Sequence, residues 1–264
     1  MNNLEKFDQW LAMNYSNPST RKLYSHKIKM FFAHNEVLTQ ETLDAFLVSK
    51  ADVWNANSYN TYRLAFIIYF KFIGEKLILP KIKKAQEKIR HYIHENELKE
   101  IIEKLPVIFN DFIKVQAVLL LGFYCALRPK EIITLKRQDI DLESKTIILR
   151  NTKTGRERIG LFPSSIKKAL VKYFEIEPED QNAFNLTYNM LQGYFTKINK
   201  MYNLKKVISP YTLRHSGAKW VLRKTHNNTN VLQRVLGHKN LLTTLRYAQI
   251  TDQDAFDELR KCIK

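Results

Sequence analysis

Residues 200–247 contain ten Lys or Arg and not one Asp or Glu. A surface that only faces solvent normally mixes both signs of charge. So long a stretch without an acid is therefore interpreted as one that holds a polyanion, and it ends in a tyrosine, Tyr247.

Charge and hydrophobicity narrow the class of protein. The formal net charge is +17, which favours nucleic acid or an anionic membrane surface as partner. A membrane span is not expected, because the longest apolar run, 117–127, is far shorter than the about 20 residues that a spanning helix needs. A secretory signal is not visible at the N-terminus, and Cys125 and Cys262 make no disulfide framework. We therefore expect a cytoplasmic, nucleoid-associated protein.

The chain has 264 residues, which is enough for one large domain or two of ordinary size, and 45% of them are hydrophobic, which is enough to form cores. Apolar residues at helical spacing predict an all-helical domain over 1–79, with its last helix stopped by Gly74. Residues 80–90 are rich in Lys and Arg and are interpreted as a linker, which either follows DNA phosphates or is simply solvated. The second domain is expected over 91–264.

In the second domain, the pattern predicts a helix over 95–105 ended by Pro106, and a buried helix over 112–127. Pro129 opens a further helix, and 139–141 marks a turn. Alternating segments over 145–150 and 156–162, joined by a Gly-containing loop, predict a β-hairpin. The fold class is thus mainly α, with a small antiparallel sheet in the second domain.

Five separated motifs resemble the tyrosine recombinase family, the integrase and Xer-type enzymes of DNA strand exchange, and they occur in that family's order. They are Ala126-Leu127-Arg128-Pro129-Lys130-Glu131, Lys153 in Thr-Lys-Thr-Gly, Ser209-Pro210-Tyr211-Thr212-Leu213-Arg214-His215-Ser216, Leu236-Gly237-His238, and Tyr247. The resemblance covers the second domain and extends more weakly to the first, which is similar to the family's SAM-like core-binding domain.

The resemblance implies site-specific cutting and rejoining of duplex DNA through a 3′-phosphotyrosine on Tyr247, without ATP or metal. The chemistry suits the residue types. Guanidinium groups such as Arg128 and Arg214 stay protonated and can bind the non-bridging phosphate oxygens, and a phenoxide can both attack and leave. Lys153 is the candidate general acid, and His238 the candidate hydrogen-bond donor to the phosphate.

Tyr211 departs from the family pattern, which most often has histidine at this position. Because the phenol of a tyrosine ordinarily has a pKa near 10, Tyr211 is expected to donate a hydrogen bond or orient its neighbours and not to act as a base. Glu131 and His215 are expected to support the site.

Simpler interpretations exist for each motif alone. Arg128 could be an ion-pair partner of Glu131, Lys153 a turn residue, His238 the residue after a helix cap, and Tyr247 a core aromatic. Two functional alternatives also remain: a type IB topoisomerase-like nicking and closing enzyme, and a DNA-binding protein with a degenerate active site.

The basic side chains expected to contact DNA are Arg63, Lys81, Lys83, Lys84, Lys219, Arg223 and Arg246. A tail helix over about 252–264, with one apolar stripe, is expected either to dock on a neighbouring protomer in a tetramer on DNA or to pack on its own domain.

Overall fold

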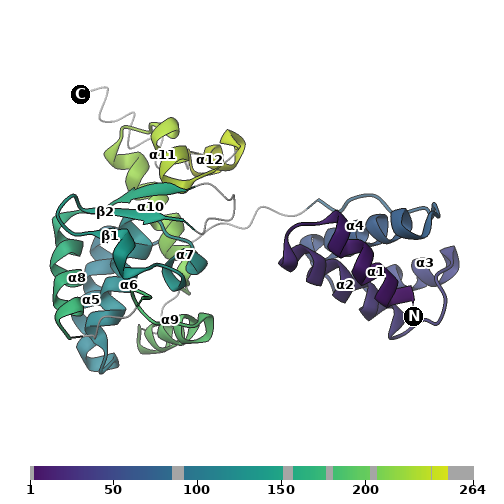
Figure 1. Cartoon of the computed structure of the whole chain (residues 1–264), viewed down its shortest axis with the longest axis horizontal. Coiled ribbons are helices and arrows are strands. Elements are labelled where there is room, and N and C mark those ends of the chain that lie inside the picture. Colours follow the sequence, from purple (N-terminus) through teal and green to yellow (C-terminus); the bar gives the residue numbers. More distant parts are fainter. Residues whose placement is uncertain are drawn as a thin grey trace. The chain divides into compact units, whose positions relative to one another are not determined.

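The computed structural model describes residues 3–84, 92–150, 157–176, 181–202, 207–238 and 240–248, except for the side chains of 246 and 248. The chain divides into two compact units, Met1–Lys88 and Ile89–Lys264 (Figure 1). The expected fold class, mainly helical with a small antiparallel sheet, is confirmed. No helix among the described residues has the length and apolar character needed to cross a membrane.

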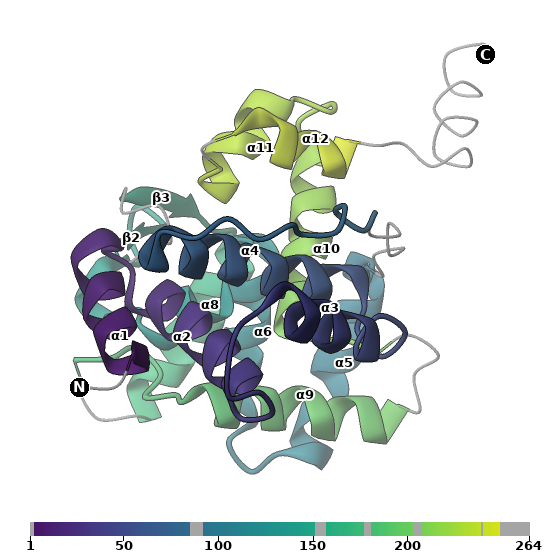
Figure 2. The ribbon, with the colours of Figure 1, turned by 90° about the vertical axis from the view of Figure 1, so that its right-hand side faces the viewer.

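The first unit packs its helices around an aromatic core. The ribbons of these helices are labelled in Figure 2. The ring of Phe31 meets those of Phe46 and Phe66 edge-on, with centroids 5.2 and 5.3 Å apart. Gly74, at φ +76°, ends the last helix in the left-handed conformation that the sequence predicts. The helices are α1 (Asn3–Asn14), α2 (Pro18–Phe32), α3 (Gln40–Ser49) and α4 (Ala56–Ile73).

Residues 75–84 follow α4 without regular structure, yet three side chains of the helices hold them. Gln40 of α3 exchanges two hydrogen bonds with the backbone of Ile78. On α4, Arg63 donates to the Pro80 carbonyl, and the Asn60 amide pairs with the backbone N–H and C=O of Lys83. The start of the basic connector thus belongs structurally to the first unit.

The second unit is built around α6, whose residues from 117 to 124 are all buried. Its elements are α5 (Glu95–Ile108), α6 (Phe112–Tyr124), α7 (Pro129–Ile133), the 3₁₀ turn η1 (Arg137–Asp139), β1 (Ile140–Asp141), β2 (Thr146–Leu149), β3 (Arg158–Leu161), α8 (Ser164–Ile176), α9 (Tyr188–Tyr202), α10 (Pro210–Lys224), α11 (Thr229–Leu236) and α12 (Leu241–Ala248).

The sheet has the order β1-β2-β3, and both pairs are antiparallel. Leu149 of β2 stands opposite Arg158 of β3. Along β3 the alternation places Arg158 and Gly160 inward and leaves the apolar side chains of Ile159 and Leu161 exposed.

Two expectations about local structure were wrong. Pro106 does not end α5, which continues to Ile108. A proline in the last turn removes only one intrahelical hydrogen bond, and the helix still closes through Phe109 N–H to the Leu105 carbonyl. Residues 140–141, expected as a turn, instead form strand β1, because Ile140 pairs with Ile147 of β2.

Helix α10 lies against α6 at very short range. An ideal Cβ at Gly217 would stand 1.8 Å from the Phe123 carbonyl oxygen, so only glycine permits this approach. The other end of α10 packs with α11 and α12 around a small apolar cluster that includes Leu232, Leu236 and the ring of Tyr247. This packing brings four of the five sequence motifs to one end of the unit.

Candidate active site

The carbonyl oxygen of Leu236 is the point where two of the motif arginines meet. Arg128 donates to it from Nη2 at 3.2 Å, and Arg214 from Nη2 at 2.9 Å. Leu236 is the last residue of α11, and Gly237 follows in the left-handed conformation at φ +62°. Since the last carbonyls of a helix lack intrahelical partners, this one is available to both guanidinium groups.

Glu131 is the acidic centre of the arginine cluster. Its carboxylate accepts from Arg128 Nη1 at 2.7 Å and from Arg158 Nη2 at 2.8 Å, and Arg214 Nη1 lies 3.8 Å away. It also accepts from the Arg128 backbone N–H, which forms the cap of α7. Burial alone would raise the pKa of Glu131, but Arg158 and the hydrogen bonds outweigh burial and lower it. The carboxylate is therefore ionised and balances part of the charge of three guanidinium groups.

Arg158 is the cluster member that sequence reasoning missed. It extends from the inward face of β3, is almost fully buried, and donates from Nη1 to the Val235 carbonyl near the end of α11. One signal was available: an arginine that shares the inward positions of a short alternating strand needs a buried acidic partner.

The guanidinium of Arg214 is buried between α10 and the loop before α7, where it also donates to the Ala126 carbonyl. Burial, followed by repulsion from Arg128, lowers the pKa of Arg214 to about 10, while Glu131 and the nearby Tyr247 phenol act in the opposite direction. The group stays protonated at neutral pH.

Tyr247 lies in α12 beside two histidines. Its side chain is 6% exposed, and its Oη is 2.8 Å from Nδ1 of His215, the residue after Arg214. His238 stacks near the tyrosine with ring centroids 6.1 Å apart, and its Nδ1 is 2.9 Å from Thr244 Oγ1. Burial and the neighbouring Arg214 and Arg128 lower the pKa of His238 to about 4, so its imidazole is neutral at physiological pH.

The structure therefore brings together Arg128, Glu131, Arg214, His215, His238 and Tyr247. Tyr211 is in the first turn of α10 with its side chain 51% exposed, one turn before Arg214. Lys153 lies outside the described residues, in the connection between β2 and β3.

The expected DNA-contact residues of the first unit divide into two groups. Lys81 and Lys84 are exposed. Arg63 Nε is bonded to the Pro80 carbonyl at 2.8 Å, and Lys83 Nζ to the Ala51 carbonyl at 2.6 Å, so both help to hold the segment that follows α4.

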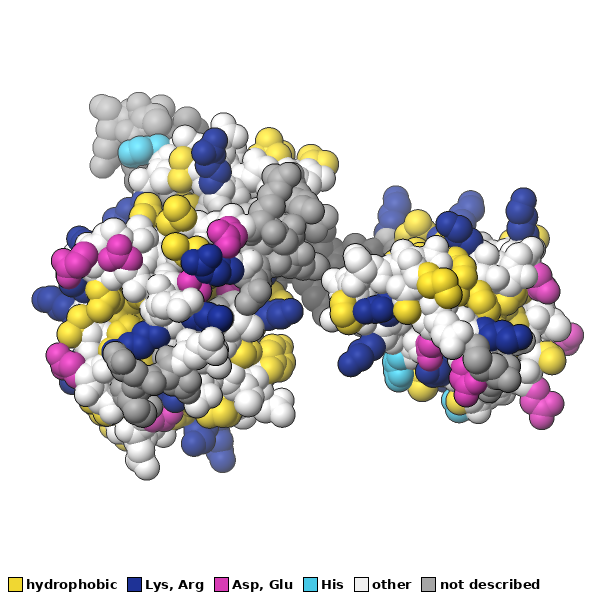
Figure 3. All heavy atoms as spheres, viewed as in Figure 1, with side chains coloured by type: hydrophobic (Ala, Val, Ile, Leu, Met, Phe, Trp, Pro, Cys, Tyr) yellow, Lys and Arg dark blue, Asp and Glu magenta, His cyan; other side chains and the backbone are white. Residues whose placement is uncertain are grey.

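In the second unit, Lys219 lies over the ring of Tyr92, and Arg223 contacts His94 Nδ1 at 3.0 Å. The side chain of Arg246 is outside the described part. Lys and Arg side chains are spread over both units on the face shown in Figure 3.

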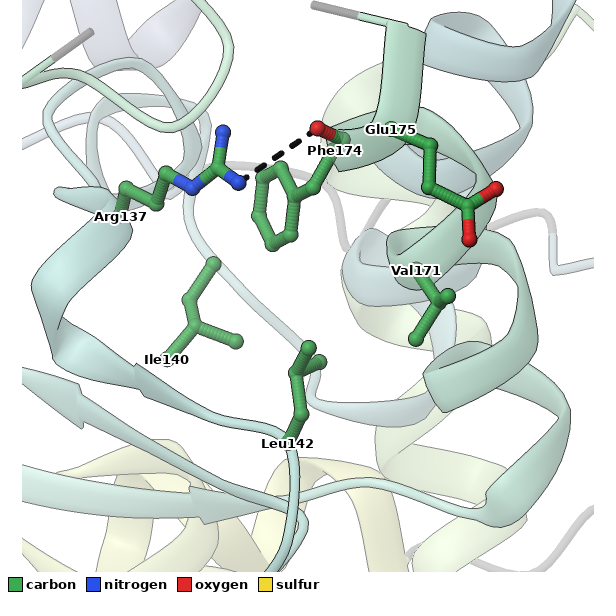
Figure 4. Close-up of a pocket in the computed structure, with 6 residues that line it drawn as sticks. All are labelled: Arg137, Ile140, Leu142, Val171, Phe174 and Glu175. Carbon is green, nitrogen blue, oxygen red and sulfur yellow. Dashed lines mark hydrogen bonds between the residues drawn. The ribbon is translucent and has the colours of Figure 1, made fainter. Parts of the chain in front are cut away.

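A separate hollow of about 320 Å³ lies between η1 and α8 (Figure 4). Arg137 covers the Phe174 ring at 4.3 Å from its centroid and donates to the Phe174 carbonyl. None of its lining residues belongs to the arginine cluster, so the hollow is not part of the candidate active site.

The mostly helical architecture with its small sheet matches solved structures of a recombinase and an integrase. The solved structure of the Tn1549 transposon integrase in complex with a circular intermediate DNA matches with a TM-score of 0.75 and 16% identity, over 99% of each chain. The crystal structure of XerA recombinase matches with a TM-score of 0.58 and 20% identity, over 98% of this chain and 97% of that one.

Sequence comparison agrees with the fold. The tyrosine recombinase XerA of Thermococcus onnurineus is 26% identical over 94% of this chain and 90% of its own length. XerA of Pyrococcus horikoshii is 26% identical over 98% of this chain and 92% of its own. Residues 91–254 match the phage integrase family.

The chain belongs to the phage integrase family. It is a tyrosine recombinase that cleaves and rejoins DNA strands at specific sites, as the sequence motifs indicated. The topoisomerase and the degenerate DNA-binding alternatives are not favoured.

Proposed function

We propose that this recombinase cleaves DNA by attack of Tyr247 Oη on a phosphodiester held by Arg128 and Arg214, leaving a 3′-phosphotyrosine and a free 5′-hydroxyl. One observation supports this most: both guanidinium groups converge on the Leu236 carbonyl, at 3.2 and 2.9 Å. Two donors that already share one oxygen atom can also share the oxygens of one phosphate.

Each guanidinium carries five N–H groups, and the side-chain hydrogen bonds described for Arg128 and Arg214 use only some of them. The remaining donors would bind the non-bridging oxygens, on which negative charge grows in the transition state. Glu131 and Arg158 fix the positions of these donors before DNA binds. Such preorganised groups are worth about 3–4 kcal/mol each when one is lost.

The other side chains take complementary roles in this proposal. Neutral His238 hydrogen-bonds a non-bridging oxygen, and Lys153 donates a proton to the leaving 5′ oxygen. Tyr211 donates a hydrogen bond to the DNA or orients its neighbours. The phosphotyrosine bond conserves the energy of the broken phosphodiester, so rejoining needs neither ATP nor a metal ion.

A duplex oligonucleotide with a nick in the scissile strand tests this proposal. The short fragment released by cleavage diffuses away, and the covalent adduct accumulates on a denaturing gel. Wild type is expected to form the adduct and Tyr247→Phe none, although both bind DNA. An adduct formed by Tyr247→Phe, or none formed by wild type, would refute the assignment, and equal adduct on unrelated sequences would favour a topoisomerase.

The first unit is proposed to act as the core DNA-binding domain, with Arg63, Lys81, Lys83 and Lys84 along phosphates. Lys219, Arg223 and Arg246 would do the same from the second unit. Because four positively charged chains can surround two DNA duplexes, the proposed active species is a tetramer on the DNA of the cytoplasmic nucleoid.

The tail at 252–264, outside the described residues, is proposed to join neighbouring protomers in this tetramer. Deleting it and weighing the free and DNA-bound species tests this part. An unchanged assembly state would refute docking on a neighbour.

A further inference from the structure

The contact between His215 and Tyr247 has no role in the mechanism above. Nδ1 of His215 and Oη of Tyr247 are 2.8 Å apart, and the two rings lie with centroids at 5.4 Å. The tyrosine is buried in the apolar cluster of α10, α11 and α12, and the histidine is half-buried on α10. The atom proposed as nucleophile therefore already shares a hydrogen bond with a titratable base.

Attack by a phenol requires the loss of a proton. A tyrosine ordinarily has a pKa near 10, so at neutral pH the O–H bond must break as the bond to phosphorus forms. An imidazole, with an ordinary pKa near 6.5, is the side chain best matched to accept a proton at that pH. A general base must also be within about 2.6–3.2 Å of the proton's heavy atom, and His215 meets this condition.

The neighbouring groups fit this role less well. His238 has its Nδ1 engaged with Thr244, and its low pKa, about 4, makes its imidazole a weak base. Glu131 accepts hydrogen bonds from arginine side chains and has a lowered pKa. The structure describes interactions of His215 with two titratable groups. One is the hydrogen bond to Tyr247 of α12, and the other is the electrostatic interaction with His238 of the α11–α12 connection.

The local sequence places the proposed base beside Arg214, which with Arg128 forms the proposed phosphate clamp. Arg214 and His215 are consecutive residues of α10, so their side chains diverge by about 100° around the helix axis. Arg214 reaches the Ala126 and Leu236 carbonyls, while His215 reaches α12. A single rigid helix thus holds a phosphate-binding group and the proton acceptor of the nucleophile.

We infer that His215 is the general base of DNA cleavage, an assignment that rests on Tyr247 being the nucleophile. As the Tyr247 Oη–phosphorus bond forms, the phenolic proton passes to Nδ1 of neutral His215, which becomes imidazolium. The phosphorus–O5′ bond breaks, and the 5′ oxygen takes a proton from the general acid. In rejoining, the 5′-hydroxyl attacks the phosphotyrosine and gives its proton back to the deprotonated general acid, while the imidazolium returns its proton to the departing Tyr247 oxygen.

His215→Gln keeps a hydrogen-bonding side chain but cannot take up a proton. On the nicked duplex, its rate of adduct formation at neutral pH is expected to fall by about 100- to 10,000-fold with unchanged DNA affinity. The deficit should narrow as pH rises, because hydroxide then removes the proton. His226→Asn, an exposed histidine at φ +49°, is the matched control and should cleave like wild type.

A substrate with sulfur in place of the bridging 5′ oxygen separates the two proton transfers. A thiolate leaves without protonation, so this substrate should relieve a general-acid variant such as Lys153→Ala but not His215→Gln. Three results would overturn the inference. They are restored cleavage by His215→Gln on the sulfur substrate, a rate of adduct formation by His215→Gln within about twofold of wild type, and a loss of rate that stays constant with pH.

A measurement on the wild-type protein tests the role of His215 even if the His215→Gln variant fails to fold. The inference requires that the neutral ring of His215 carry its proton on Nε2, so that Nδ1 accepts from Tyr247. Nitrogen-15 NMR of the wild type reports this tautomer, and a proton on Nδ1 would overturn the assignment. Wild type that forms no adduct would instead refute the proposed function, so the two failures are distinguishable.

Discussion

Glu131 and Arg158 form a buried ion pair, with Oε2 and Nη2 2.8 Å apart, that joins helix α7 to strand β3. The same carboxylate holds Arg128, and Arg158 also reaches the end of α11, whose last carbonyl receives Arg128 and Arg214. One acid thus connects three separated segments and sets the positions of both arginines of the proposed phosphate clamp.

Replacing Glu131 should destabilise the fold strongly. Glu131→Gln removes the charge that balances three neighbouring guanidinium groups, and breaking a buried pair in this way typically costs about 3–5 kcal/mol. Urea unfolding measures the loss. Glu143→Gln is the control, because Glu143 pairs with Lys167 at the surface with its side chain 91% exposed, and should cost no more than about 1 kcal/mol. Equal losses in the two variants would contradict the central role of Glu131.

Arg158 should affect cleavage without affecting DNA binding. Arg158→Lys keeps a positive charge near Glu131 but cannot also donate to the Val235 carbonyl, so the clamp shifts relative to α11. A displacement of about 1 Å can cost roughly 100-fold in rate. Adduct formation and DNA affinity, measured side by side, check this expectation. Arg137→Lys, which alters an arginine stacked on Phe174 outside the cluster, should leave both unchanged.

The stability of the protein should rise with pH because of His238. Its pKa falls from 6.5 to about 4 on folding, mainly through burial and then through Arg214. Between pH 6.5 and about pH 4 the unfolded chain binds more protons than the folded protein. The contribution of His238 to the free energy of unfolding is therefore fully present above the unfolded-state pKa and is lost as the pH falls towards the folded-state pKa. Urea midpoints across this range should show a shallower pH dependence for His238→Asn. His26→Gln, at an exposed site on α2, should keep the wild-type slope.

Gly217 should tolerate no side chain. A methyl group there would meet the Phe123 carbonyl oxygen at 1.8 Å, and separating α10 from α6 should cost about 3 kcal/mol. Gly193→Ala, at an exposed position of helix α9 where an added Cβ meets no atom within 4 Å outside the helix's own backbone, should instead stabilise by about 0.5–1 kcal/mol. Thermal melts of both variants test the contrast, and a stable Gly217→Ala protein would show that the two helices separate easily.

Much of the fold could be predicted because the deciding signals are local. Gly74 stops α4, and Asn17 and Thr39 cap the helices that follow them. Prediction from the sequence failed at two points of the secondary structure. The pairing of Ile140 with Ile147 makes a strand of an expected turn. Helix α5 differs from expectation for a local reason: it continues through Pro106 because the rest of its last turn remains hydrogen-bonded.

Residue identity and spacing along one chain are enough to assign the family and the order of its motifs. The motifs did not place Arg158 in the arginine cluster, and they did not show that His215 and not Tyr211 contacts the nucleophile candidate. These points depend on the folded arrangement, because such contacts join residues 27 and 32 positions apart through the packing of α7, β3, α10 and α12. The free energy of those contacts depends on burial and distance, which no local pattern encodes.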